Sequence, residues 1–162
     1  WEEKNIIYAV GIVNGNRLRK LHFVNGIDYA ASADVYERMS RVIRNGIQAI
    51  PDIESADTEE LGRVNRVDPL GITYLRIRGM WVIENPAKVF SYIYPGNLGD
   101  GFGLMAVINT QTYASFAASD RIMIERLAES RDDFRIDAVR IKTPDNPVVP
   151  KSAKLITFRG RA

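Results

Sequence analysis

The sequence predicts an α+β fold, a mainly antiparallel sheet packed against two helices. Segments of strand length outnumber segments with helical periodicity. Most consecutive strands are separated only by short turns, which favours antiparallel pairing. The expected order is roughly ββ-α-ββ-β-α-ββ, with strands between the helices. A chain of 162 residues has the length of one domain, so we expect residues 1–162 to form a single α+β domain.

The N-terminal segment predicts a β-hairpin. Residues Asn5–Val13 form an apolar run of strand length, and Arg17–Val24 has the composition of a returning strand. Asn14-Gly15-Asn16 stands between them and is a strong turn signal, because glycine and asparagine tolerate the positive φ angles of tight hairpin turns.

A helix is expected over Ser32–Asn45. Its apolar residues recur at the spacings of one helix face, and they are Val35, Met39, Val42 and Ile43. Ser32 is the expected N-cap, since its hydroxyl can accept a hydrogen bond from an orphan backbone N–H. Gly46 is the residue expected just after the helix.

The middle of the chain predicts a loop and a second hairpin. Residues 51–71 are polar and at first acidic, so we expect a long surface loop with a short helical turn near Thr58–Val64. Ile72–Ile83 alternates as a strand, and Ala87–Tyr94 is expected to return beside it. The glycine-rich segment 95–103 follows as a connecting loop.

The C-terminal part predicts three strands and one helix. A strand begins at Leu104, and the chain passes into a helix near Ser119–Ser130. Phe134–Lys142 alternates as a strand. Thr143–Lys151 contains three prolines and is expected to be a stiff loop before the last strand, Lys154–Arg159.

The composition excludes several kinds of chemistry. The chain has no cysteine and one histidine, so it cannot build a Cys/His or three-His metal site, a cysteine nucleophile or a disulfide framework. We therefore expect no metal and no cofactor. A catalytic His22 would need a placed partner, and the sequence indicates none, so we expect a strand histidine that faces solvent or is hydrogen-bonded. The acidic clusters Asp52–Glu60 and Asp132–Asp133 show no arrangement for carboxylate catalysis.

The apolar segments, the first residue and the lack of cysteine bear on membrane attachment and on the cellular compartment of the protein. No run of about 18 apolar residues occurs, so no membrane span is expected within the chain. The chain begins at Trp1 rather than at Met, so we expect an excised or processed fragment of a longer precursor, and a membrane anchor could lie only outside this chain. A cysteine-free sequence slightly favours an extracytoplasmic, periplasmic location.

Two groups of residues are candidates for contact with a partner. Tyrosine, arginine and methionine are enriched in interface cores, and one face of the expected strand 72–83 carries Tyr74, Arg76, Arg78 and Met80. Three aromatic residues flank the glycine-rich loop, namely Tyr92, Tyr94 and Phe102. The loop itself fits no phosphate-binding motif, and Asp100 would repel a phosphate.

The basic residues suggest an anion-binding site. Arg38, Arg41 and Arg44 form a stripe on the expected helix, and guanidinium groups bind phosphates and carboxylates well. Arg76 and Arg78 beside Tyr74 could add phosphate contacts and base stacking. The net charge of only +2 and the absence of known nucleic-acid-binding motifs weigh against this hypothesis.

The leading hypothesis from the sequence is a non-enzymatic protein-interaction or assembly module, the soluble domain of a bacterial cell-envelope complex subunit. Its expected partner is another protein or a second copy of the chain. The alternative is a domain that binds nucleic acid or another anionic ligand. The second alternative is a small-molecule enzyme or sensor that uses the glycine-rich loop 95–103.

Overall fold

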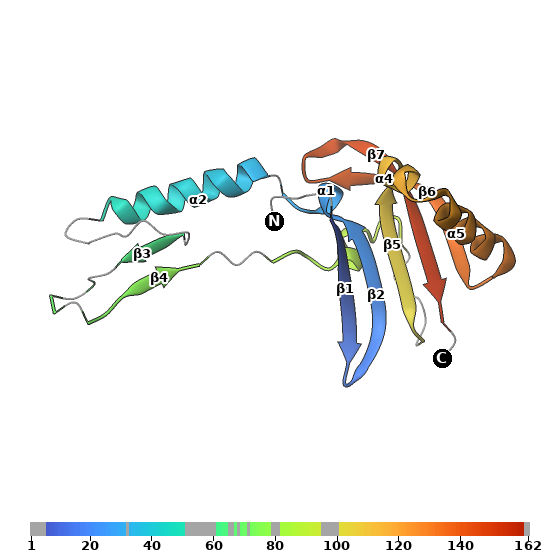
Figure 1. Cartoon of the computed structure of the whole chain (residues 1–162), viewed down its shortest axis with the longest axis horizontal. Coiled ribbons are helices and arrows are strands. Elements are labelled where there is room, and N and C mark those ends of the chain that lie inside the picture. The colour runs from blue at the N-terminus through green and yellow to red at the C-terminus, as the bar shows by residue number, and fades with distance from the viewer. Residues whose placement is uncertain are drawn as a thin grey trace. The chain divides into compact units, whose positions relative to one another are not determined.

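The computed structural model of the chain divides it into two compact units (Figure 1). The first unit consists of Trp1–Ala30 and Glu84–Ala162, and the second of Ala31–Ile83. The structure describes residues 6–31, 33–50, 61–64, 67, 69–70, 72–78, 82–94 and 101–160. Helices and a mainly antiparallel sheet confirm the α+β class. The single domain over 1–162 stays a prediction, and each unit is described by itself.

The first unit is built on a five-stranded sheet. The strand order is β1-β2-β5-β7-β6. All neighbouring pairs are antiparallel except β2 and β5, which are parallel. Parallel neighbours need a long crossover connection, and here the whole of the second unit belongs to that connection. The strands are β1 (Ile7–Asn14), β2 (Arg17–Asn25), β5 (Gly103–Asn109), β6 (Phe134–Thr143) and β7 (Asn146–Arg159).

The predicted N-terminal hairpin is confirmed. β1 and β2 pair antiparallel, and Asn14 lies opposite Arg17 at the turn. Gly15 has a φ of 62°, in the left-handed region that glycine enters without steric cost. The turn residues in the sequence were therefore sufficient to locate this element.

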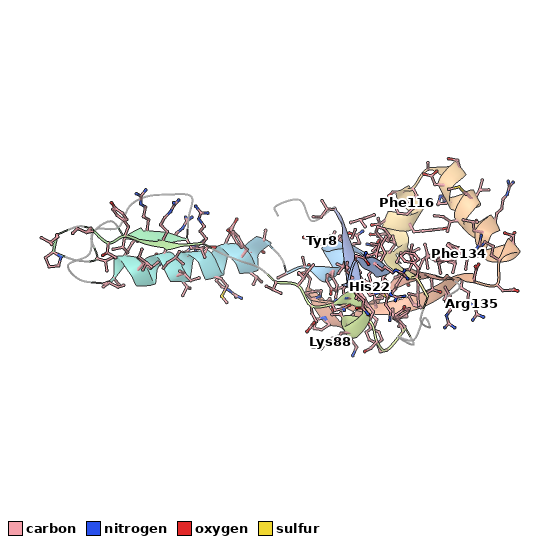
Figure 2. The ribbon with its side chains drawn as sticks, turned by 90° about the horizontal axis from the view of Figure 1, so that it is seen from below. Tyr8, His22, Lys88, Phe116, Phe134 and Arg135 are labelled. Carbon is pink, nitrogen blue, oxygen red and sulfur yellow. The ribbon has the colours of Figure 1, made fainter. Side chains whose placement is uncertain are left out.

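One face of the sheet is covered by α4 (Thr110–Ser115) and α5 (Ala118–Ser130). The buried centre of this layer contains Ala106, Ile108, Tyr113 and Ile156. Phe116 and Phe134 pack against it on the side of the helices (Figure 2). The helix predicted near Ser119–Ser130 is thus confirmed as α5, and α4 is an additional helix directly after β5.

The other face of the sheet is covered by the short helices α1 (Gly26–Tyr29) and α3 (Pro86–Val89) and by the turns after α3. Phe90 and Tyr94 are each 1% exposed, and the ring of Tyr94 lies 6.4 Å from the ring of His22 on β2. Lys88 marks α3 on this side of the sheet in Figure 2. The sheet is therefore covered on both faces around its central strand β5 and the end of β2, while much of β1 and β6 stays exposed.

The second unit contains α2 (Ala33–Gln48), β3 (Gly62–Val64) and β4 (Leu75–Ile77), with β3 and β4 antiparallel. The helix predicted over Ser32–Asn45 is confirmed, but Gly46 does not end it. The helix continues through Ile47, whose buried side chain meets Gly62 so closely that a Cβ there would lie 2.2 Å from Ile47 Cδ1. That packing outweighs the weak helix propensity of glycine.

The predicted second hairpin is wrong. β4 pairs with β3 rather than with residues 87–94, and those residues begin as helix α3. Asn85 is the N-cap of α3, because its Oδ1 accepts a hydrogen bond from Ala87 N at 2.9 Å, and Pro86 stands where a missing N–H does no harm. The expected helical turn near Thr58–Val64 is strand β3 over Gly62–Val64, and residues 58–60 lie outside the described part.

The predicted stiff loop over Thr143–Lys151 is also wrong. A tight turn brings Thr143 opposite Asn146, and β7 begins there and includes Pro147 and Pro150. Both prolines precede the part of β7 that pairs with β5. They therefore lie on a stretch with one neighbouring strand, where a missing N–H is tolerated on the open side. No helix among the described residues is long and apolar enough to cross a membrane.

Candidate nucleic-acid interface

The parallel strands β2 and β5 end in asparagines at the same edge of the sheet. Asn25 Oδ1 accepts a hydrogen bond from Ile27 N at 3.2 Å and caps α1. Asn109 Oδ1 accepts one from Thr112 N at 2.8 Å and caps α4. Asparagine is a preferred N-cap because its short side chain reaches orphan backbone N–H groups. Each strand therefore passes directly into a helix at this edge.

A buried carboxylate ties these strand ends to β7. The side chain of Asp28 is 3% exposed. Its Oδ2 accepts a hydrogen bond from Asn109 Nδ2 at 2.6 Å, and its Oδ1 accepts one from Lys151 Nζ at 3.2 Å. Asn25 Nδ2 donates to Thr112 Oγ1 at 2.7 Å beside this group. A buried charge is stable only when it is paired and hydrogen-bonded, and Asp28 meets that condition.

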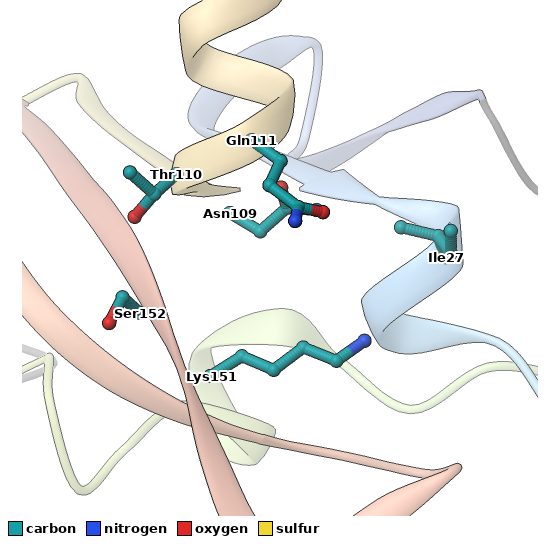
Figure 3. Close-up of a pocket in the computed structure, with 6 residues that line it drawn as sticks. All are labelled: Ile27, Asn109, Thr110, Gln111, Lys151 and Ser152. Atoms are coloured by element: carbon teal, nitrogen blue, oxygen red, sulfur yellow. The ribbon is translucent and has the colours of Figure 1, made fainter.

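A pocket of about 320 Å³ lies above this network (Figure 3). Gln111 and Asn109 enter it from the start of α4, and Lys151 extends across the opposite side. The side chains of Gln111, Thr110 and Ser152 belong to exposed residues. Strand ends of a sheet are where ligands commonly bind, because the loops and helix starts there leave polar groups exposed. The lining residues are Ile27, Asn109, Thr110, Gln111, Lys151 and Ser152.

His22 is not the solvent-facing or hydrogen-bonded histidine that was expected. It is fully buried, and neither ring nitrogen has a hydrogen-bond partner among the described residues. Burial lowers the pKa of His22 below its usual 6.5, and the positive charge of Lys20 lowers it further. The side chain of Asn85 acts in the opposite direction but is not within hydrogen-bonding geometry. Burial, more than the nearby charge of Lys20, therefore disfavours the protonated form of this imidazole.

The residues predicted to contact a partner lie in different environments. Tyr74 is 63% exposed, and Arg76 and Arg78 are exposed in the same segment of the second unit. Arg76 stands opposite Arg63 across the β3–β4 pair. Met80 lies outside the described residues. The expected surface at Tyr74 is thus accessible where the structure describes it.

The aromatic residues beside the glycine-rich loop are mostly engaged within the first unit. Tyr94 is buried, and Phe102 packs with its ring 6.3 Å from that of Phe158. Tyr92 is 53% exposed, and its hydroxyl accepts a hydrogen bond from Lys142 N at 2.9 Å. The structure therefore places Tyr94 in the core instead of on a surface, and Tyr92 is the most exposed of the three. Residues 95–100 of the loop lie outside the described part.

The predicted anion-binding arginines share one helix. Arg38, Arg41 and Arg44 are exposed on α2 at three-residue spacing. This spacing keeps their side chains along one broad strip of the helix surface. The strip carries three guanidinium groups within two turns, which is a suitable density for successive phosphates.

A sequence model of the NgoPII restriction endonuclease family matches residues 1–142. The chain belongs to this family. A type II restriction enzyme, NgoPII of Neisseria gonorrhoeae, is 48% identical over 159 residues, which are 98% of this chain and 56% of the relative. The chain therefore spans little more than half the length of that relative. No solved structure matches the chain.

The family membership corrects the leading hypothesis from the sequence. A non-enzymatic assembly subunit of the cell envelope is wrong, and the alternative of a nucleic-acid-binding domain agrees better with the family. Reasoning from short motifs missed this because it recognised no nuclease motif, whereas the likeness extends over 159 residues. The exposed arginines were the one signal that indicated it.

Proposed function

We propose that the chain binds double-stranded DNA as part of a type II restriction endonuclease. The observation that carries the proposal is the 48% identity to a type II restriction enzyme over 98% of the chain. A DNA-cleaving enzyme must hold a polyanion, and the arginine strip of α2, formed by Arg38, Arg41 and Arg44, offers that charge on an exposed surface.

The described residues support binding more directly than cleavage. Nucleases often use divalent metal ions, which activate water and stabilise the leaving oxygen. Within the described ranges, no three His, Cys, Asp or Glu side chains gather closely enough to hold such an ion. No cleavage step is assigned to these residues.

Fluorescence anisotropy with a labelled DNA duplex tests the proposal. The chain is expected to bind the duplex, and the logarithm of its association constant should fall linearly with the logarithm of salt concentration between about 50 and 200 mM. The slope arises because each neutralised phosphate releases counterions. Absence of binding at the low-salt end would contradict the proposed function.

The arginine strip can be tested by a charge-matched comparison. Changing Arg38, Arg41 and Arg44 to Gln should make the salt slope shallower by about 2.7 if each residue neutralises one phosphate. The control removes the same charge from exposed arginines of the first unit, through Arg17→Gln, Arg126→Gln and Arg135→Gln. Equal losses in both variants would mean that net charge, rather than the arginine strip, governs binding.

The predicted association with a protein partner or a second copy of the chain stays a proposal beside DNA binding. Light scattering of the chain with and without duplex DNA measures the mass of the complex. A complex that contains two chains per duplex would support it, and one chain per duplex at all concentrations would contradict it.

A further inference from the structure

The pocket at the ends of β2 and β5 is poorly suited to a phosphate. Its ammonium group, Lys151 Nζ, lies 3.2 Å from the buried Asp28 carboxylate. The pocket therefore holds a balanced pair of charges rather than a net positive charge. A phosphate would be drawn to the lysine but repelled by the carboxylate directly behind it.

The remaining polar groups of the pocket are neutral. The amide of Gln111 provides two N–H donors and one acceptor oxygen, and the hydroxyls of Thr110 and Ser152 can each donate or accept. Ile27, which is 38% exposed, adds an apolar wall (Figure 3). Donors and acceptors beside an apolar surface suit a planar heterocycle, whose edge is polar and whose faces are not.

The size of the pocket restricts the ligand further. A volume of about 320 Å³ lies at the lower end of the range for small-molecule pockets, which is roughly 300–1,000 Å³. It is sufficient for one base but not for several nucleotides. The pocket thus has room for a single base and not for a longer stretch of nucleic acid.

The pocket wall that carries Gln111 is anchored on both sides of that residue. Asn109, two positions before it, donates to Asp28 at 2.6 Å and accepts from Thr112 N at 2.8 Å. Thr112, the next residue, also accepts a hydrogen bond from Asn25 at 2.7 Å. The backbone of Gln111 is therefore held by a buried network while its side chain stays exposed. A recognition residue needs this combination, because selectivity depends on fixed geometry.

We propose that this pocket receives the hydrogen-bonding edge of one nucleobase of bound DNA and that Gln111 is a specificity-determining residue. The inference rests on the proposed function, because it takes DNA as the molecule that supplies the base. The arginine strip and the pocket have separate roles. The first contributes affinity that does not depend on sequence, and the second discriminates between bases.

Selection from a pool of DNA duplexes with randomised central positions tests the pocket. The unchanged chain should enrich a preferred base at one or more positions. Gln111→Leu should lose about 5- to 150-fold of the preference at one position, which is the discrimination of one good base contact. Its affinity for the unselected pool and its salt slope should not change. The matched control is Gln48→Leu, at the other glutamine of the chain, which is exposed on α2 in the second unit.

The possible results distinguish failure of the role given to the pocket from failure of the proposed function. If Gln111→Leu keeps every base preference, or if the unchanged chain binds DNA without enriching any sequence, the role given to the pocket is wrong and DNA binding stands. If the Gln48→Leu control loses preference as Gln111→Leu does, the effect does not belong to the pocket. If the unchanged chain binds no DNA at low salt, the proposed function fails, and the inference fails with it.

Discussion

The buried His22 makes the stability of the protein depend on pH in a way that can be calculated. Burial lowers its pKa in the folded chain, so as the pH falls below 6.5 the unfolded chain takes up this proton before the folded chain does. Stability contributed by the neutral imidazole is complete above the unfolded pKa. It is lost as the pH falls from there towards the folded pKa, with a limiting slope of about 1.4 kcal/mol per pH unit.

That slope gives the expected loss of stability over a pH interval in which the protein can be studied. Between pH 7.0 and 5.5 the loss from this one group is at most about 1.3 kcal/mol, reached when the folded pKa lies well below 5.5. The charged group that acts on His22 is Lys20, which disfavours protonation, and the neighbouring ring of Tyr94 offers no opposite charge. The direction of the change is therefore fixed by the surroundings of His22.

Urea unfolding of the unchanged chain and of His22→Leu at both pH values measures this effect. The variant removes the titrating group and leaves no ring nitrogen without a partner, so its stability should fall less between pH 7.0 and 5.5. Because His22 is the one histidine of the chain, its ring proton in NMR titration reports the folded pKa without assignment. A midpoint at or above 6.5, or equal pH dependence in both proteins, would refute the reasoning.

Three substitutions test other details of the packing by their effect on the free energy of unfolding. Gly15→Ala should destabilise the chain by about 1 kcal/mol, because residue 15 has a φ of 62° that L side chains adopt at a cost. Gly46→Ala should stabilise it by about 0.5–1 kcal/mol, since this helical glycine has open space around it. Tyr94→Phe should be neutral or stabilising by about 1 kcal/mol, because the buried hydroxyl has no hydrogen-bond partner among the described residues. Urea denaturation checks all three, and a change of opposite sign in any of them would contradict the local geometry described for that residue.

Local sequence signals predicted the elements that depend on local interactions. The turn at Gly15 located the first hairpin, and the periodicity of α2 and α5 located those helices to within a few residues. Pairing between distant segments was harder to predict. The alternation in residues 72–83 indicated a strand but did not identify β3 as its partner. Strand periodicity fixes which side chains share a face and leaves open which other strand supplies the hydrogen bonds.

The sequence by itself determined the α+β class, the first hairpin, the helices α2 and α5, and the arginines of α2. Only the tertiary structure decided that β2 and β5 lie side by side in parallel, that His22 is buried, and that a polar pocket exists. That pocket depends on Asp28 meeting Asn109, 81 residues away, and Lys151, 123 residues away. Such contacts form when assembly of the whole sheet offsets the entropy cost of joining distant segments, and no periodicity within a short window carries that information.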